Sequence, residues 1–421
     1  MRFKAILFPA AFILCGMTFG QSGKGSLVIA GGGLDPDNRS VYSQLVELAG
    51  GPETGSFAII PAASSVPVQS YAFIRQTLIS YNVKPENIHL ISIALMDDDS
   101  TKDVDESKWA SNGNNMQLAE TVRNCSAVWF TGGDQMRVTK ALVRPDGGQT
   151  PMLEAVWEVY NKGGVIGGSS AGAALMSEVM IGNGTSLGAL QMKIITDNGP
   201  ENEETDSLLL SKGLGFFPEG IVDQHFNARA RLGRLIIALL YSIDRFNVAF
   251  GVDENTALIY SASDRRIQVA GEAGVTIIDA SEAAVSYVGN LPDIKNLAIS
   301  YIEEGDTYVV PTGEITPAMG KKATRGNEYY IRENPAQGGI LSPNGATFLD
   351  IITYNLIDNK ACDTVSNLSF AGNEIGFLLT FTKKPESQGY YAESAREEDL
   401  YTVSDIRLDI TPVKVTITKI R

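Results

Sequence analysis

Short and almost continuous apolar runs alternate with helical patterns between Ser26 and Tyr260. Strands are expected at Ser26–Ala30, Phe57–Ile60, Ile88–Ile91, Ala127–Phe130, the run at Val165 and Ile166, Ile221–Val222 and Asn247–Val252. Helical spacing covers Val68–Tyr81 and Pro151–Lys162. Unbroken apolar strands that alternate with helices indicate a mostly parallel sheet with both faces covered. The pattern therefore predicts an α/β protein built as a three-layer sandwich.

The second half of the chain has a different pattern, with short β-type runs separated by polar turns. These runs are Ile267–Ala270, Val275–Ile278, Leu297–Ile302, Tyr308–Val310, Leu378–Thr382 and Val413–Ile417. We expect one domain over residues 21–300 and a β-rich C-terminal region over residues 301–421. Between the predicted strands, Ile181–Ser211 reads as loop-rich and contains an acidic run at Glu201–Asp206.

The N-terminus has the pattern of a secretory signal peptide over residues 1–20. Two basic residues, Arg2 and Lys4, precede an apolar run at Ala5–Met17, and small residues follow. Leu14 argues against lipoprotein processing at Cys15, because that cleavage favours a small residue there. We expect a secreted or periplasmic protein, with no later stretch that crosses a membrane.

Charge and composition narrow the function classes. The formal net charge of −15 excludes a nucleic-acid partner, because no basic surplus is present to neutralise phosphates. Cys125 and Cys362 lie far apart in the sequence, so a metal site made of cysteines is excluded. A single disulfide bond between the two stays possible. No metal or cofactor is expected, since no glycine pair continues into a dinucleotide motif. Of the two histidines, His89 lies inside a predicted strand and is interpreted as structural, which leaves His225 for chemistry.

The segment from Gly163 to Leu175 carries the strongest chemical motif. Its apolar strand ends in Gly168-x-Ser170-x-Gly172 and runs into a helix-forming Ala-Ala-Leu. This is the strand–turn–helix pattern of a nucleophile elbow, in which small neighbours allow the turn that presents the serine hydroxyl.

Two further strand ends supply the partners that an activated serine needs. His225 follows one apolar run and Glu254 follows another, so the chain offers a hydroxyl, an imidazole and a carboxylate. We predict Ser170 as nucleophile, His225 as base and Glu254 as the group that orients it, although Asp253 adjoins Glu254. The order Ser, His, acid differs from the α/β-hydrolase order and disfavours an ordinary esterase or lipase. The backbone N–H groups of Gly133 and Ala171 are the predicted oxyanion donors.

The region after His225 contains three arginines. On a helical wheel that starts at His225, Arg229 lies within the apolar arc and Arg231 and Arg234 lie outside it. An inward guanidinium needs a carboxylate partner or a polar pocket. Arg229 is therefore expected to face inward, and Arg231 and Arg234 to lie on a solvated face.

Four segments together resemble the cyanophycinases, in the serine peptidase family that also contains aspartyl dipeptidase (peptidase E). They are FTGGDQ at 130–135, GSSAGA at 168–173, DQHF at 223–226 with the three arginines that follow, and GVDENTA at 251–257. The resemblance extends over about Ser26 to Tyr260. It implies a class I glutamine-amidotransferase-like fold and a homodimer.

The resemblance also implies a substrate pocket and a reaction. The pocket residues would be Gln135, Asp223, Gln224, Arg229, Arg231 and Arg234. The reaction would be hydrolysis of cyanophycin, a polyaspartate that carries arginine on its β-carboxyls, to β-Asp-Arg dipeptides. The arginines suit the aspartate carboxylates, and Asp223 suits the substrate guanidinium.

Two other functions stay open at this point. The chain is an aspartyl or isoaspartyl dipeptidase if it acts on short peptides and not on the polymer. It is a secreted binding protein on a retired peptidase scaffold if Ser170 is unreactive and the C-terminal region does the binding. The presence of all three residue types of the triad counts against the binding protein.

Overall fold

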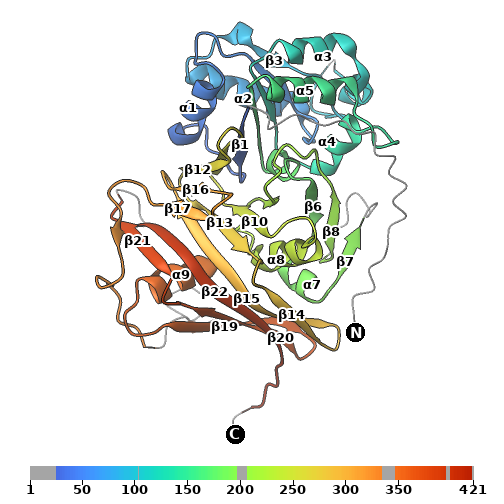
Figure 1. The fold of residues 1–421 in the computed structure, drawn as a ribbon. Coiled ribbons are helices and arrows are strands. Elements are labelled where there is room, and N and C mark those ends of the chain that lie inside the picture. Colours follow the sequence, from blue (N-terminus) through green and yellow to red (C-terminus); the bar gives the residue numbers. More distant parts are fainter. Residues whose placement is uncertain (1–24, 103, 197–205, 334–346, 395–398, 420–421) are drawn as a thin grey trace.

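Two large β-sheets organise the part of the chain that this computed structural model describes, residues 25–102, 104–196, 206–333, 347–394 and 399–419 (Figure 1). The predicted signal peptide, Cys15 and residues 201–205 of the acidic run lie outside these described residues. No helix within the described ranges has the length and apolar character needed to cross a membrane.

The first sheet has nine strands and contains the predicted parallel core. In spatial order they are β17 (Glu314–Thr316), β16 (Thr307–Val309), β12 (Arg266–Gly271), β11 (Thr256–Ser261), β1 (Ser26–Ala30), β5 (Val165–Ser169), β4 (Ala127–Phe130), β2 (Phe57–Ile60) and β3 (Ile88–Leu90). The pairings from β1 to β3 are parallel, and those from β17 to β1 are antiparallel. His89 lies on β3, the edge strand, separated from β5 by β4 and β2.

Helices cover both faces of the parallel strands, because side chains alternate between the two faces along each strand. Val28 and Trp129 pack against α1 (Arg39–Leu48) and α2 (Pro67–Ser80). Leu27 and Phe130 lie in the opposite core, with α3 (Met116–Arg123), α4 (Gln135–Leu142) and α5 (Pro151–Asn161). This arrangement confirms the predicted three-layer α/β sandwich.

The second sheet is almost entirely antiparallel and joins the middle of the chain to its C-terminal region. Its main path is β18 (Lys322–Ala323), β21 (Gln388–Ala392), β22 (Leu400–Lys414), β15 (Leu291–Glu303), β13 (Gly274–Asp279), β10 (Val248–Val252) and β9 (Ile221–Asp223). Beside it, β14 (Ala284–Val288) pairs with β15, and β20 (Ile375–Thr382) pairs with β22 and with β19 (Thr364–Gly372). The β-rich C-terminal region is thus confirmed.

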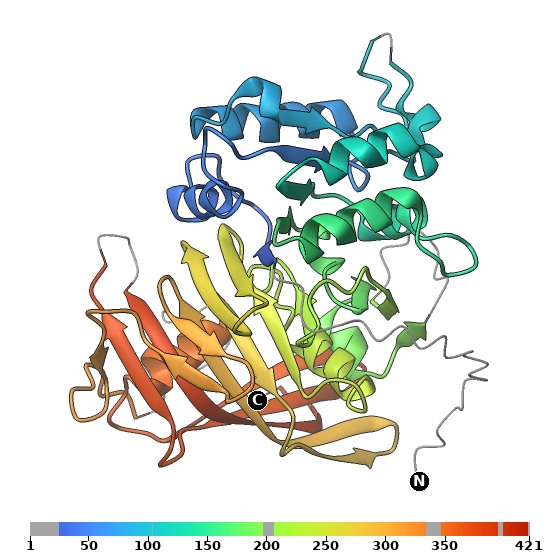
Figure 2. The same cartoon turned by 45° about the horizontal axis from the view of Figure 1, so that its top comes forward.

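The C-terminal strands share a sheet and a core with the strands before residue 300. Figure 2 shows the orange and red strands beside the yellow ones, and β15 pairs with β22 along most of its length. The expected division at residue 300 falls inside β15. The core on this sheet includes α8 (Leu232–Tyr241) and α9 (Phe348–Ile352).

Two sequence expectations differ from the structure. The apolar runs at Ile221–Val222 and Asn247–Val252 belong to the second sheet, not to the parallel one. The segment expected to be loop-rich forms β6 (Val179–Asn183), α7 (Ser186–Leu190), β7 (Ile194–Thr196) and β8 (Leu208–Lys212), and its strands make a three-stranded sheet.

Cys125 and Cys362 are both free thiols, so the disulfide bond that the sequence left possible is not formed.

Candidate active site

Ser170 lies in the sharp turn between β5 and α6 (Ala171–Ala174), with φ 57° and ψ −110°. The two glycines of the motif allow this turn because the backbone packs too closely there to leave space for a side chain. A Cβ on Gly168 would lie 2.6 Å from the carbonyl oxygen of Gly172, and a Cβ on Gly172 would lie 2.4 Å from that of Phe130. The backbone therefore has the nucleophile-elbow form that the motif predicts.

His225 reaches the serine from the second sheet, two residues after β9. Its ring Nε2 lies 2.8 Å from Ser170 Oγ. Its backbone N–H donates to the carbonyl of Gly31 over 2.6 Å, and its φ is +46°. A Cβ on Gly32 would lie 2.2 Å from the ring Cε1, so only glycine leaves room for the imidazole here.

Glu254 completes the hydrogen-bonded series from the segment between β10 and β11. Its Oε1 lies 2.5 Å from His225 Nδ1. The neighbouring Asp253 faces elsewhere and accepts hydrogen bonds from the N–H of Asn227 at 2.8 Å and the hydroxyl of Tyr301 at 3.3 Å. Of the two adjacent acids, Glu254 is therefore the one in contact with the imidazole.

The surroundings of the imidazole favour its neutral form. Burial lowers the pKa of His225, the Glu254 carboxylate opposes that shift, and the positive charges of Arg229 and Arg231 add to it. A neutral ring that donates Nδ1–H to Glu254 leaves Nε2 free to accept the hydroxyl proton of Ser170. Burial raises the pKa of Asp253 to about 7.

The two predicted oxyanion donors flank the serine. Ala171 is the first residue of α6, where an N–H has no partner inside the helix. Gly133 has φ +138°, and a Cβ there would lie 2.1 Å from the carbonyl oxygen of Ala63. Among the residues that the structure describes, neither N–H donates a hydrogen bond. Both amides are thus available to a developing oxyanion.

A buried ion pair lies beneath the site and corrects the prediction for the arginines. Arg234 is 3% exposed, and its Nε and Nη2 donate to Asp223 over 2.7 and 2.6 Å. Arg229, expected to face inward, is exposed. The wheel was wrong because the chain after His225 is a turn, with φ +49° at Ala230, and helical spacing begins only at Leu232.

The remaining predicted pocket residues lie close to this pair or to the elbow. Arg231, also expected on a solvated face, has a side chain only 11% exposed; it donates from Nη1 to the carbonyl of Gln224 over 2.5 Å and lies 3.6 Å from Asp223 Oδ1. The Gln224 side-chain oxygen lies 3.5 Å from Ser170 Oγ. Gln135 donates from Nε2 to the carbonyls at 181 and 182 over 2.8 and 2.9 Å, which holds β6 against the start of α4. Their roles toward a substrate stay predictions.

Sequence reasoning missed two features of the site. Glycines 31–33 are absent from the predicted site residues, although Gly32 supports the imidazole and Gly33 lies beside Glu254. The three groups were also expected from one sheet. In the structure, Ser170 comes from the first sheet, His225 from the second, and Glu254 from the segment that joins them. The signal for the first feature was the run of three glycines itself.

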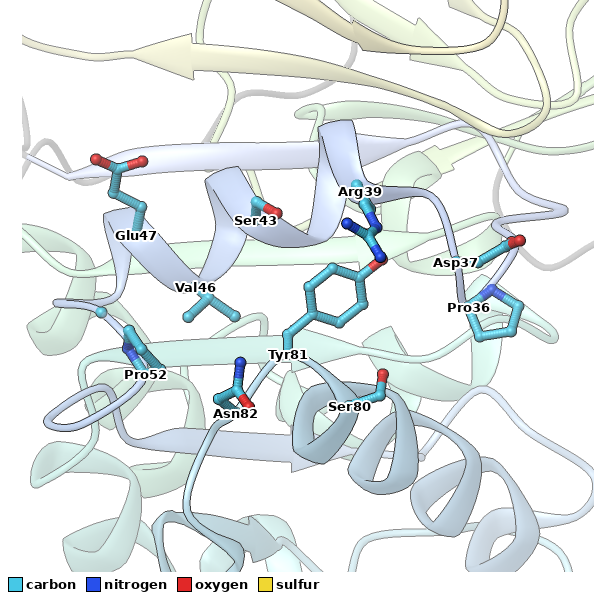
Figure 3. Close-up of a pocket in the computed structure, with 11 residues that line it drawn as sticks. Pro36, Asp37, Arg39, Ser43, Val46, Glu47, Pro52, Ser80, Tyr81 and Asn82 are labelled. Carbon is cyan, nitrogen blue, oxygen red and sulfur yellow. The ribbon is translucent and has the colours of Figure 1, made fainter.

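A large cavity lies away from this chemistry. It measures about 940 Å³ and lies between α1 and the end of α2, where Arg39 and Tyr81 face each other (Figure 3). None of the predicted site residues lines it. A cavity of about 570 Å³ adjoins the site itself, because Glu254 lines it together with Tyr354 and Tyr401 of the C-terminal region.

Comparison with known proteins gives a family match. The model of peptidase family S51 matches residues 27–268, which contain the elbow, His225 and Glu254. The cyanophycinases of Synechococcus elongatus and Thermosynechococcus vestitus are each 30% identical to this chain over 311 residues, which are 71% of this chain and 83% of each relative. The cyanophycinase of Geminocystis herdmanii is 33% identical over 202 residues, 47% of this chain and 66% of the relative.

Among solved structures, a peptidase from an acI-B1 Actinobacterium matches with a TM-score of 0.45 and 19% identity, over 68% of this chain and 98% of that one.

Proposed function

Because the chain belongs to peptidase family S51 and is a serine-type peptidase, we propose that it is a secreted exopeptidase that hydrolyses cyanophycin to β-Asp-Arg dipeptides. Ser170, His225 and Glu254 are the catalytic residues in this proposal. The observation that supports these roles most directly is the series of contacts at 2.8 and 2.5 Å from the hydroxyl through the imidazole to the carboxylate.

The proposed mechanism is acyl transfer through a covalent intermediate. Ser170 Oγ attacks the scissile carbonyl carbon while His225 Nε2 takes the hydroxyl proton. Glu254 holds the ring through Nδ1 and stabilises the imidazolium. The N–H groups of Gly133 and Ala171 donate hydrogen bonds to the carbonyl oxygen as negative charge develops on it. His225 then gives its proton to the leaving amine, and a water activated by the same ring releases the acyl group.

The charged groups near the elbow suit a substrate with both carboxylates and guanidinium groups. Arg229 is exposed one turn beyond His225 and is available to a substrate carboxylate. Asp223 is already engaged by Arg234 and Arg231. We therefore assign Asp223 to holding the arginines in place, and leave the substrate guanidinium to other acids at the site.

The test is clearance of insoluble cyanophycin and release of β-Asp-Arg by the purified protein. Ser170→Ala is expected to lower kcat at least about 10³-fold, because the residual rate comes only from binding and the oxyanion donors. Ser263→Ala, at an exposed serine of the first sheet's rim, is the matched control and is expected to act like the parent. Equal clearance by Ser170→Ala would overturn the mechanism, and activity on Asp-Xaa or β-Asp-Xaa dipeptides alone would overturn the substrate.

Secretion is tested separately, by sequencing the N-terminus of protein recovered outside the cytoplasm. Processing close to Gln21 is the expected result. Recovery of the unprocessed chain in the cytoplasm would contradict it.

A further inference from the structure

A second cavity of about 390 Å³ lies on the α1 and α2 side of the first sheet, at the carboxyl ends of β4 and β5. It is separate from the large cavity of Figure 3. Its lining consists of Leu34, Tyr42, Val66, Gln69, Ser70, Phe73, Ile74, Trp129, Thr131, Gly132 and Ser169. No lining residue is charged, and the aliphatic and aromatic members give it largely apolar walls.

Three polar groups in this lining lack a hydrogen-bond partner. They are the indole Nε1 of Trp129, the hydroxyl of Tyr42 and the hydroxyl of Thr131, in side chains that are 1%, 1% and 3% exposed. Buried polar groups are almost always paired, and an unpaired one costs about 1–3 kcal/mol. All three belong to side chains that line this one cavity.

The chemistry of these groups specifies an acceptor. An indole N–H only donates, and both hydroxyls have a proton to donate. Burial raises the pKa of Tyr42, so its hydroxyl keeps that proton. The first turn of α2 adds to this character, because its N-cap residue Val66 provides no side-chain cap for the amides of a 14-residue helix. The lining therefore offers donors and the partial positive charge of a helix N-terminus, with the Asp35 carboxylate close enough to Tyr42 to raise its pKa further.

The cavity adjoins the proposed nucleophile. Ser169, which lines it, immediately precedes Ser170 in the chain. Gly132 also lines it, and a Cβ at that glycine would lie 3.5 Å from Ser170 Cβ. Leu34 follows the glycines that support His225 and Glu254. A group bound in the cavity is thus connected by a few atoms to a peptide at the elbow.

We propose that this cavity is a substrate subsite that binds a carboxylate carried on a short apolar stem, with Trp129, Tyr42 and Thr131 as donors. The proposal rests on the peptidase function and assigns specificity to residues outside the arginine group. The carboxylate is either the side-chain carboxylate of an acidic residue or the terminal carboxylate of a peptide. A carboxylate, unlike an amide, brings acceptors and no new donor, which matches the surplus of donors in the lining.

A binding experiment on the Ser170→Ala protein tests this without turnover. The chain has three tryptophans, so the ¹⁵N-indole spectrum has three N–H signals, and Trp129→Phe identifies the one of interest. The probes are N-acetylaspartate 1-amide, with only the side-chain carboxylate, and N-acetylasparagine, with only the terminal one. N-acetylasparaginamide is the neutral control.

The Trp129 signal is expected to move to lower field with one of the carboxylate probes and not with the neutral control, while the Trp109 and Trp157 signals stay in place. The probe that moves the signal identifies the source of the carboxylate. No movement, or equal movement with the neutral control, would overturn the proposal and leave a cavity that holds only water.

Kinetics of conservative variants provide a second, independent readout. Tyr42→Phe and Thr131→Val keep the shape of the side chain and remove one donor, while Trp129→Phe removes the N–H donor together with part of the ring system, a loss that the Trp157→Phe control reproduces. Each of the three lining variants is expected to raise KM for the carboxylate substrate about tenfold with a smaller change in kcat. Trp157→Phe and Tyr81→Phe are matched controls, since each also removes a buried unpartnered donor but lies outside this lining. Equal effects from the controls would assign the change to stability and overturn the subsite.

The two proposals fail in different ways. A chain that clears no cyanophycin but shows the indole shift loses the polymer as substrate and keeps the subsite. A chain that clears the polymer without the shift keeps the function and loses the subsite.

Discussion

At the candidate site, the type of residue at a position follows from the neighbouring groups that it contacts or must leave space for. Gly32 has no side chain because the His225 ring occupies that space, and Glu254 differs from its neighbour Asp253 by facing that ring. Ser170 and His225 both have positive φ, a conformation that costs about 1–3 kcal/mol for such residues. Backbone conformation and close packing, more than residue type alone, therefore bring the three groups together.

The protonation of His225 gives a prediction for pH dependence. A general base must be neutral, so activity falls as pH decreases through the pKa of the imidazole. Because that pKa is lowered, we expect the acid limb of kcat/KM below the ordinary histidine value of about 6.5. Arg229→Gln removes a cation that disfavours the imidazolium, so the pKa should rise and the limb should move to higher pH.

NMR titration of His225 checks this directly, with His89, the other histidine of the chain, as an internal reference. Arg266→Gln, which removes an exposed arginine paired with Asp264, is the control and should leave the titration of His225 in place. A fall in the pKa of His225 in Arg229→Gln would contradict the electrostatic argument.

Gly32→Ala should displace the imidazole. The added Cβ would lie 2.2 and 2.3 Å from ring atoms, and misplacing a reacting group by about 1 Å costs about 100-fold in rate. We expect kcat to fall by at least about that factor. The control is Gly51→Ala, which has φ +84° but no atom within 4 Å of the new Cβ. It should lose about 1 kcal/mol of stability and no activity. Similar kcat values for the two variants would rule out the steric explanation.

At the scale of elements, α8 and β9 are joined by the Asp223–Arg234 pair. Arg234 Nη1 also donates to the carbonyl of Gly184 over 2.8 Å, so the guanidinium connects α8 and β9 to the segment between β6 and α7. With both partners almost fully buried, removing Arg234 leaves the Asp223 carboxylate with Arg231, 3.6 Å away, as its counter-charge. The pair therefore stabilises the turn that contains His225.

Arg234→Met is expected to lower the free energy of unfolding by about 3–5 kcal/mol, measured by urea denaturation. The double variant Asp223→Leu/Arg234→Met should lose less than the sum of the two single effects, because each single variant leaves the other charge of the pair buried, while the loss of the Arg231–Asp223 contact at 3.6 Å is common to both variants that change Asp223. A double variant that loses the sum of both single effects would show that the two side chains act independently.

The parallel strands of the first sheet could be predicted from the sequence because their apolar runs are buried and bounded by glycine, proline or other small residues. Ser26–Ala30, Phe57–Ile60 and Ala127–Phe130 have the bounds that the pattern predicts. The sheet to which β9 and β10 belong could not be predicted, since a buried apolar strand looks the same in either sheet. The burial of the arginines could not be predicted either, because the turn before Leu232 breaks the helical spacing.

At the scale of the whole molecule, most strands of the C-terminal region are part of the second sheet and its core, while β16 and β17 belong to the first sheet. The strand β22 pairs with β15 in the second sheet. Its buried residues belong to the same cluster as Leu235 and Ile299; they are Val403, Ile406, Leu408 and Ile410. The candidate site depends on this sheet through β9 and β10. The region beyond residue 300 therefore contributes to the stability of the segments that carry His225 and Glu254.

Truncation after residue 300 is expected to prevent folding, because it cuts β15 and uncovers its apolar residues. Soluble expression, near-UV circular dichroism and cyanophycin clearance together check this. A truncated protein that stays monomeric, folded and active would show that the first 300 residues form an independent domain.

The chemical groups come from two sheets that are linked through the segment between β10 and β11. The turnover rate therefore depends on how tightly the two sheets pack against each other. During gradual heating, a small separation of the two sheets would move the His225 imidazole away from the Ser170 hydroxyl while the strands of both sheets stay folded. Activity should therefore be lost at a temperature several degrees below the unfolding midpoint measured by circular dichroism.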